Sequence, residues 1–348
     1  MHNQTDWQIV PNFAFDTLCL LNALTGDEFY LTYYQREYDH FAPLIELDAD
    51  ARQAMAELTR KVKIEGKEII SAFFCLYFSA VEVEDIDDLL TTLQDTSALH
   101  RNFAETAYFD PEGEKLFESV KPELGVILRF LQSVNVEQYW RDRFLPAIEA
   151  KIAEIGAQLP QYNIVPLVER HLGTALADNR ITVYMLGFTQ PHGIRIVGTR
   201  YLTDVSWPFR IVLSNAVHEM LHPPYRLDEE LLAQLQYFKD DTFVMDKVLN
   251  HNPAFGYNTF EGYIEEDCVQ ALDQYLNEKL GVAKDAVKRW QDSDDGMHVL
   301  ALVLNSKIKE QKFPQNGESF RAFLTRLITS GQLADIKRQY ERIVAAAN

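Results

Sequence analysis

The chain has 348 residues, of which 47% are hydrophobic, 12% aromatic and 24% charged, the composition of a globular protein with a sizeable core. Its 52 acidic residues outnumber its 33 Lys and Arg residues and give a formal net charge of -19. A chain this acidic is repelled by nucleic-acid phosphates and by anionic lipid surfaces. We therefore expect neither a nucleic-acid partner nor a membrane partner.

Cysteine usage and the N-terminal segment indicate the compartment. Cys19, Cys75 and Cys268 are widely spaced and form no CxxC pair, which argues against a disulfide framework and against a cysteine-built zinc site. The first apolar stretch is short, lies between Asp16 and Asp27, and has no basic residues before it, so it is typical of a helix rather than a signal peptide. These features favour a cytoplasmic protein.

The first half of the chain has a helical pattern. From about residue 15 to 175, apolar residues recur at spacings of three and four, as in DTLCLLNALTG and GEKLFESVKPELGVILRFLQSV. Pro and Gly are scarce in these stretches. The pattern predicts a helical region over residues 1–175.

Strand-like sequence begins near residue 178. The runs RITVYMLGF and IRIVGTRYL are separated by TQPHG, in which Pro191 and Gly193 favour a turn. This arrangement predicts a β-hairpin and hence a small antiparallel sheet. Helical periodicity then resumes and continues to the C-terminus. We therefore expect an α+β protein, mostly α, with a helical region over 1–175 and a second domain over 176–348.

A metal-binding motif directly follows the second strand-like run. His218, Glu219 and His222 form an HExxH sequence, in which two histidines one helical turn apart can hold one metal ion. Zinc lowers the pKa of a bound water to about 7, and Glu219 is placed to take its proton. HExxH arises by chance in roughly one or two of a hundred chains of this length. The sequence around the motif therefore decides whether it indicates a metal site.

The helical phase of the motif separates the histidines from the apolar residues. His218 and His222 lie opposite an apolar arc, which predicts that the helix packs one face into the core and presents both imidazoles on the other. Pro223 and Pro224 should end the helix at His222, because the residue before a proline avoids helical geometry. The arc contains Val212, Leu213, Ala216, Val217, Met220 and Leu221.

A third zinc ligand is expected on the run TFEGYIEEDCVQALDQYL. It contains Glu261, Glu265 and Glu266, and a ligand that points into a cleft should lie opposite the packed apolar face of its helix. This favours Glu266, leaves Glu265 as the alternative and places Glu261 third. Gln270, one turn after Glu266, is placed to orient it through a hydrogen bond.

These residues together resemble a known class of enzymes. A β-hairpin, an HExxH helix and a glutamate on a later helix resemble the zincin metallopeptidases, and in particular the gluzincin branch, whose third ligand is a glutamate. HEMLHPPYRLD lacks the Gly and third His of the metzincin motif. IEEDCVQALDQYL is also similar to a group of uncharacterised bacterial zincin-like proteins. The resemblance covers about residues 178–280.

The resemblance implies a mechanism and a substrate class. It implies one Zn²⁺ held by His218, His222 and Glu266, with Glu219 as general base, in a zincin-like metallohydrolase domain over 176–348. The substrate would be a peptide or protein, bound in extended form along one of the two strand-like runs. If the cleft shares the negative charge, we expect basic or neutral peptides to be preferred.

A catalytically inactive zincin-fold binding or scaffold protein is the alternative function. The presence of Glu219 argues against it, because a site that only holds metal needs no general base.

A peptidase also needs a donor for the oxyanion of its transition state. His298 is the leading candidate, and a surface histidine near a helix end is the competing interpretation. Tyr257 and Tyr263 are further candidates, although we expect tyrosines in this chain mainly to pack.

Overall fold

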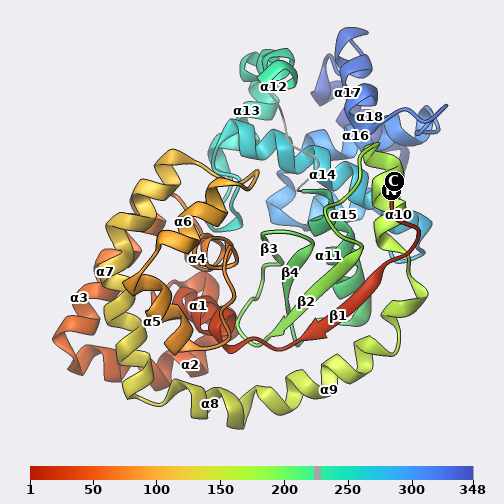
Figure 1. The fold of residues 1–348 in the computed structure, drawn as a ribbon. Helices are drawn as coiled ribbons and strands as arrows, with labels where there is room; N and C mark the ends of the chain where they lie inside the picture. Colours follow the sequence, from red (N-terminus) through yellow and green to blue (C-terminus); the bar gives the residue numbers. More distant parts are fainter. Residues whose placement is uncertain (223–228, 348) are drawn as a thin grey trace. The chain divides into compact units, whose positions relative to one another are not determined.

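The computed structural model describes residues 1–222 and 229–347. The chain forms two compact units. The N-terminal unit consists of Trp7–Leu159 and Arg180–Phe209, and the C-terminal unit consists of Met1–Asp6, Pro160–Asn179 and Arg210–Asn348. Helices dominate both units, and the strands form one small sheet, so the predicted class, α+β and mostly α, is confirmed (Figure 1).

The N-terminal unit is built from two stretches of chain, a mainly helical one and, after the chain has returned from the other unit, three strands. Its helices and strands are β1 (Asp6–Val10), α1 (Phe13–Leu24), α2 (Glu28–Leu47), α3 (Ala49–Leu58), the π-helix η1 (Thr59–Glu65), α4 (Ile70–Phe78), α5 (Ile86–Gln94), α6 (Ser97–Ala104), α7 (Pro111–Ser133), α8 (Val136–Arg143), α9 (Leu145–Gly156), β2 (Arg180–Leu186), β3 (Ile194–Ile196) and β4 (Arg200–Asp204).

The C-terminal unit contains helices and short 3-10 segments. They are α10 (Ile164–Leu172), α11 (Phe209–Leu221), α12 (Glu229–Leu235), η3 (Gln236–Asp240), α13 (Thr242–Asn250), η4 (Pro253–Phe255), α14 (Phe260–Lys279), α15 (Ala286–Asp292), η5 (Asp294–Gly296), α16 (Val299–Glu310), α17 (Phe320–Thr329) and α18 (Ile336–Ala347). The 3-10 turn η2 (Leu159–Gln161) lies where the two units meet in the sequence.

The sheet is mixed, whereas the sequence predicted an antiparallel one. The predicted β-hairpin between the two strand-like runs is also wrong, because β2 and β4 are parallel. The strand order of the sheet is β1-β2-β4-β3, with β2 parallel to β4 and β3 antiparallel to β4. The second strand-like run divides into β3 and β4 at a turn where Gly198 has a φ of 82°, a conformation that only glycine adopts freely. The hairpin therefore lies within that run. β2 lies between β1 and β4 and is buried along almost its whole length, as is typical of a strand in a parallel pair.

A strand also occurs inside the region predicted to be helical. β1 forms one edge of the sheet, beside β2. It is only five residues long and half-buried, so its alternating pattern is too short to stand out from the helical sequence that follows.

The compact units have other bounds than the two regions expected from the sequence. The strands belong to the unit that holds α1–α9, whereas α11 and the helices after it belong to the C-terminal unit. The division into functional domains at 1–175 and 176–348 stays a prediction.

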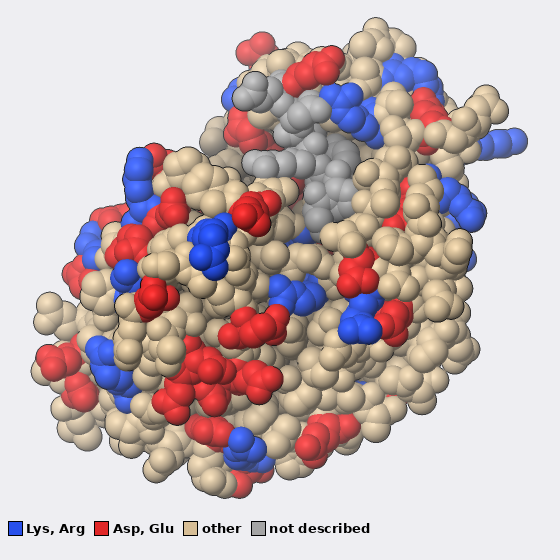
Figure 2. Space-filling view, in the orientation of Figure 1, with Lys and Arg blue, Asp and Glu red and all other residues tan. Residues whose placement is uncertain are grey.

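Three further features bear on the predicted class of protein. Cys19, Cys75 and Cys268 are all free and buried. In the described part of the chain, no helix combines the length and apolar character that crossing a bilayer requires. On the face shown in Figure 2, acidic and basic side chains both occur across the surface, with a group of acidic side chains in its lower central part.

Helix α1 is the centre of the N-terminal unit. Every residue of α1 is buried, and the helix packs against α2, α4, α5 and β2. Its polar side chains therefore need partners inside the protein. The Asp16 carboxylate accepts hydrogen bonds from the backbone N–H groups of Gly187 and Phe188 and, at 2.6 Å, from the indole N–H of Trp140. Burial raises the pKa of Asp16 to about 7, although these donors favour the charged form.

Replacing Asp16 with Asn is expected to lower the free energy of unfolding by about 1–3 kcal/mol. The amide oxygen can still accept from Gly187 and Phe188, but the amide NH₂ then faces the Trp140 indole N–H. Adding Trp140→Phe removes that conflict, so the double variant should recover part of the loss. Denaturant unfolding measures both effects, with the exposed Asp39→Asn as a control that should stay within about 0.5 kcal/mol of wild type. Strictly additive losses in the double variant would contradict the pairing.

Candidate metal centre

Helix α11 presents the HExxH histidines as the sequence predicts. The residues of the apolar arc are all buried, whereas the side chains of His218 and His222 keep 16% and 19% of their surface exposed. The helix ends at Leu221, and His222 lies in the turn that follows. Pro223 and Pro224, which we expect to end the helix, lie outside the described residues.

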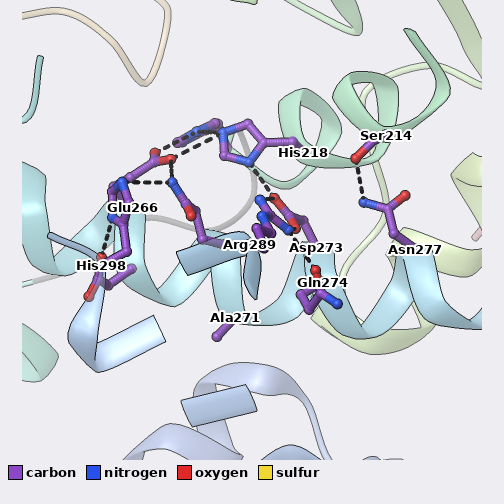
Figure 3. A network of polar contacts seen from close by, with 12 residues as sticks. Ser214, His218, Glu266, Ala271, Asp273, Gln274, Asn277, Arg289 and His298 are labelled. Atoms are coloured by element: carbon purple, nitrogen blue, oxygen red, sulfur yellow. Dashed lines mark hydrogen bonds and ion pairs between the residues drawn. The ribbon is translucent and has the colours of Figure 1, made fainter. Parts of the chain in front are cut away.

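Helix α14 brings the third member of the group. Glu266 projects from α14 toward both histidines and is 1% exposed (Figure 3). The Nε2 atoms of His218 and His222 are 3.1 Å apart. Glu266 Oε1 lies 3.4 Å from Nε2 of His218, and Glu266 Oε2 lies 3.4 Å from Nε2 of His222. Two imidazole nitrogens, from α11 and from the turn after it, thus face the two oxygens of one carboxylate on α14.

The dimensions of this group fit a zinc ion. Tetrahedral zinc with ligand distances of 2.0–2.2 Å places neighbouring ligand atoms about 3.3–3.6 Å apart. The separations of 3.1, 3.4 and 3.4 Å between neighbouring donor atoms lie close to that range, with each carboxylate oxygen facing a different imidazole. Glu266 Oε2 is also buried without a hydrogen-bond partner, which is costly for a carboxylate oxygen unless a cation is bound. Within the described residues, His218, His222 and Glu266 are the one such cluster able to hold a metal ion.

The other ring nitrogen of His218 is fixed by a carboxylate. Nδ1 of His218 donates to Asp273 Oδ2 at 2.6 Å, which directs Nε2 at the site. Burial opposes protonation of His218, but the negative charges of Glu266 and Asp273 outweigh it and raise the pKa of His218 to about 9. Without metal, the imidazole therefore carries a proton at neutral pH that a metal ion must displace.

Glu266 is held in its orientation by Gln270. Gln270 Nε2 donates to Glu266 Oε1 at 2.9 Å, which confirms the predicted hydrogen bond. Burial alone would raise the pKa of Glu266, but His218 and His222 hold it well below its ordinary value. Glu266 is therefore a carboxylate over the whole physiological pH range.

Glu266 is at the site as predicted, but its surroundings on α14 differ from those we expected. We expected Glu266 on a face of its helix opposite the packed one, but α14 is buried on nearly every side. Its polar residues make a second packed face, because they pair with one another and with α11, α15 and the segment before α16. The alternative Glu265 is half-buried and outside the cluster, and Glu261 is exposed beside Lys239.

His298 is fully buried, so it is not the surface histidine of the competing interpretation. Its Nδ1 lies 2.6 Å from Asp267 Oδ1, and its Nε2 lies 3.2 Å from Asp294 Oδ2. Burial lowers its proton affinity, but these two carboxylates more than compensate and raise the pKa of His298 to about 10. Both ring nitrogens are engaged behind Glu266, and the role of His298 as an oxyanion donor stays a prediction.

The two candidate tyrosines differ in what their hydroxyls do. Tyr263 is fully buried and donates to the Met297 carbonyl at 2.7 Å, so it packs as expected. Tyr257 is half-buried and has a φ of 58°, a left-handed conformation that is uncommon for a bulky residue. Burial and the nearby charges of Glu266 and Glu219 raise the pKa of Tyr257 well above its ordinary value, so its hydroxyl remains a donor.

Glu219 lies beside the three ligand candidates. It is 5% exposed, and its charge acts on both His218 and Tyr257. A carboxylate in this place can exchange protons with a molecule bound at the cluster.

The sequence interpretation missed Asp273, Arg289 and Trp290. Asp273 lies seven residues after Glu266 and three after Gln270, so all three fall on one face of α14. That spacing of polar residues was a usable signal. No comparable pattern marks Arg289 or Trp290, which reach this face from another helix.

No protein-family model, curated protein or solved structure matches this chain.

Removing one ligand candidate is expected to abolish tight metal binding. His218→Ala and Glu266→Gln should each weaken Zn²⁺ binding by more than about 100-fold, the upper end of what loss of an outer hydrogen-bond partner causes. Competition with a chromophoric chelator measures the affinity. Glu265→Gln and Glu261→Gln make the same chemical change on the same helix and should bind as wild type does. A loss confined to Glu265→Gln would assign the third ligand to Glu265 instead.

Proposed function

We propose that this protein is a zinc-dependent hydrolase, and specifically a peptidase of the zincin class, with Zn²⁺ held by His218, His222 and Glu266. The observation that carries the proposal is the meeting of these side chains around a buried carboxylate oxygen that has no hydrogen-bond partner. They come from α11 and α14, far apart in the sequence, so the motif alone does not create the arrangement.

Each residue of the site has a distinct chemical role. A zinc ion at this position would polarise a substrate carbonyl and acidify a water molecule. Glu219 takes the proton of the attacking water and later delivers it to the leaving amine. Asp273 keeps the His218 imidazole oriented, and Gln270 does the same for the Glu266 carboxylate.

The composition of the cluster favours catalysis over a purely structural or binding role. Structural zinc sites use four protein ligands, whereas catalytic sites use three and keep one position open. The described residues supply three ligand atoms and, beside them, the Glu219 carboxylate. An inactive zincin-fold binding protein would need the three ligands but would have no use for Glu219.

Glu219→Gln separates the catalytic function from metal binding. The amide cannot accept a proton, so hydrolysis should fall by about 10²- to 10⁴-fold while Zn²⁺ content stays unchanged. Cleavage of a peptide library, followed by mass spectrometry, measures the rate, and Glu265→Gln serves as the matched control. Equal product from wild type and Glu219→Gln would leave only the binding function.

Tyr257 is the hydroxyl donor that the structure favours for the oxyanion. Its phenol stays protonated and bonds to the Glu266 carboxylate at the cluster, whereas the hydroxyl of Tyr263 bonds to a backbone carbonyl. Tyr257→Phe should therefore lower the rate constant kcat by about 100-fold when measured at saturating Zn²⁺. Tyr263→Phe should lower stability without a comparable change in kcat. A larger loss of kcat in Tyr263→Phe than in Tyr257→Phe would reverse the assignment.

A further inference from the structure

Two neighbouring residues of α15 reach different targets on α14. The Arg289 guanidinium pairs with both oxygens of Asp273, with Nη2 3.0 Å from Oδ2. Trp290 Nε1 donates to Gln270 Oε1 at 2.7 Å. Trp290 is 1% exposed, and α15 is a short helix that begins with the Asp285 side chain accepting from the Lys288 N–H.

Each of these targets holds one of the proposed metal ligands. Asp273 binds Nδ1 of His218, and Gln270 binds Oε1 of Glu266 (Figure 3). Arg289 and Trp290 are thus each linked to a different ligand through one intermediate residue. In this way α15 supports Asp273 and Gln270, and these support His218 and Glu266. Gln270 Nε2 also lies 3.0 Å from Nε2 of His298.

The Trp290 contact decides which way the Gln270 amide faces. An indole N–H can only donate, so the amide oxygen must face Trp290. The amide NH₂ then faces Glu266 and donates to its carboxylate. With the amide reversed, an N–H group would oppose the indole N–H and an oxygen would oppose the carboxylate, which together outweigh the one contact that the reversal would improve, that with Nε2 of His298 at 3.0 Å. Trp290 therefore fixes the orientation that holds Glu266.

The Arg289 contact fixes the position of the Asp273 carboxylate. Arginine remains charged at any pH that the folded protein survives, and its planar fork matches the two carboxylate oxygens. Asp273 is 1% exposed and would be costly to bury as an unpaired charge. Paired with Arg289, it stays a carboxylate that accepts from the His218 Nδ1–H, and the Nε2 lone pair of His218 remains available to a metal ion.

We propose that Arg289 and Trp290 are positioning residues through which α15 sets the metal affinity of the site. Arg289 fixes the ring tautomer of His218 through Asp273, and Trp290 fixes the orientation of Glu266 through Gln270. The inference rests on the proposed metal centre but not on hydrolysis, because its direct consequence is metal affinity and ligand geometry.

Trp290→Phe tests the link through Gln270 by removing a single N–H group. Zn²⁺ affinity should fall by about 10- to 100-fold, the usual effect of losing an outer partner of a ligand. The visible absorption of bound Co²⁺, which depends on ligand geometry, should change as well. Trp140→Phe is the matched control, since it removes an equivalent buried indole donor, the one bonded to Asp16 in the N-terminal unit. It should cost stability and leave both metal readouts unchanged.

Arg289→Gln tests the link through Asp273. Zn²⁺ affinity should again fall by about 10- to 100-fold, and Arg289→Lys should recover only part of it, because lysine restores the charge but not the fork. Arg326→Gln removes an arginine that pairs with Glu318 in the same unit and should bind Zn²⁺ as wild type does. If Trp290→Phe fails to fold, Gln270→Met breaks the same link from α14.

The outcomes distinguish this inference from the proposed function. If His218→Ala loses Zn²⁺ but Trp290→Phe and Arg289→Gln bind it as tightly as wild type, the positioning role is overturned and the metal centre stands. If His218→Ala also binds as wild type does, both are overturned. If Trp290→Phe and Arg289→Gln bind Zn²⁺ more weakly while Glu219→Gln keeps full peptidase activity, the positioning role is supported and the peptidase mechanism is refuted.

Discussion

The buried carboxylates of α14 are the constraint on which the C-terminal unit depends. Glu266, Asp267 and Asp273 are each at most 1% exposed, and an unpaired carboxylate in such a place costs several kcal/mol. Each must therefore meet a positive or donor group from another element. His298, in the turn before α16, meets Asp267, while His218 of α11 and Arg289 of α15 meet Asp273. The helices around α14 are held in register by these pairs.

Of these three carboxylates, Glu266 is the one whose hydrogen-bonding capacity is not filled by other groups of the protein. Gln270 donates to one oxygen, and the other has no hydrogen-bond partner, while Nε2 of His222 lies 3.4 Å from it. A folded protein rarely leaves such an atom buried unless a ligand or ion completes it. The same charge that makes α14 difficult to bury thus creates the proposed cation site, and the neighbouring pairs hold its side chains in place.

Local sequence patterns predicted the features that depend only on residues close together in the chain. The spacing of His218 and His222 and the apolar arc behind them required only helical geometry, and both are as expected. Gln270 was found for the same reason, one turn after Glu266. The β-sheet was predicted less well, because pairing between β2 and β4 depends on partners distant in the sequence, and Gly198 allowed one apparent strand to become two.

The sequence by itself determined the class, α+β and mostly α, and a set of residues able to bind metal, because helical periodicity and HExxH spacing are local properties. Only the tertiary structure decided which of three glutamates joins the histidines, that His298 is buried, and that Arg289 and Trp290 bond to Asp273 and Gln270. These choices depend on which buried charges and donors meet between helices. The energy of a buried polar group is set by partners that lie far away in the chain.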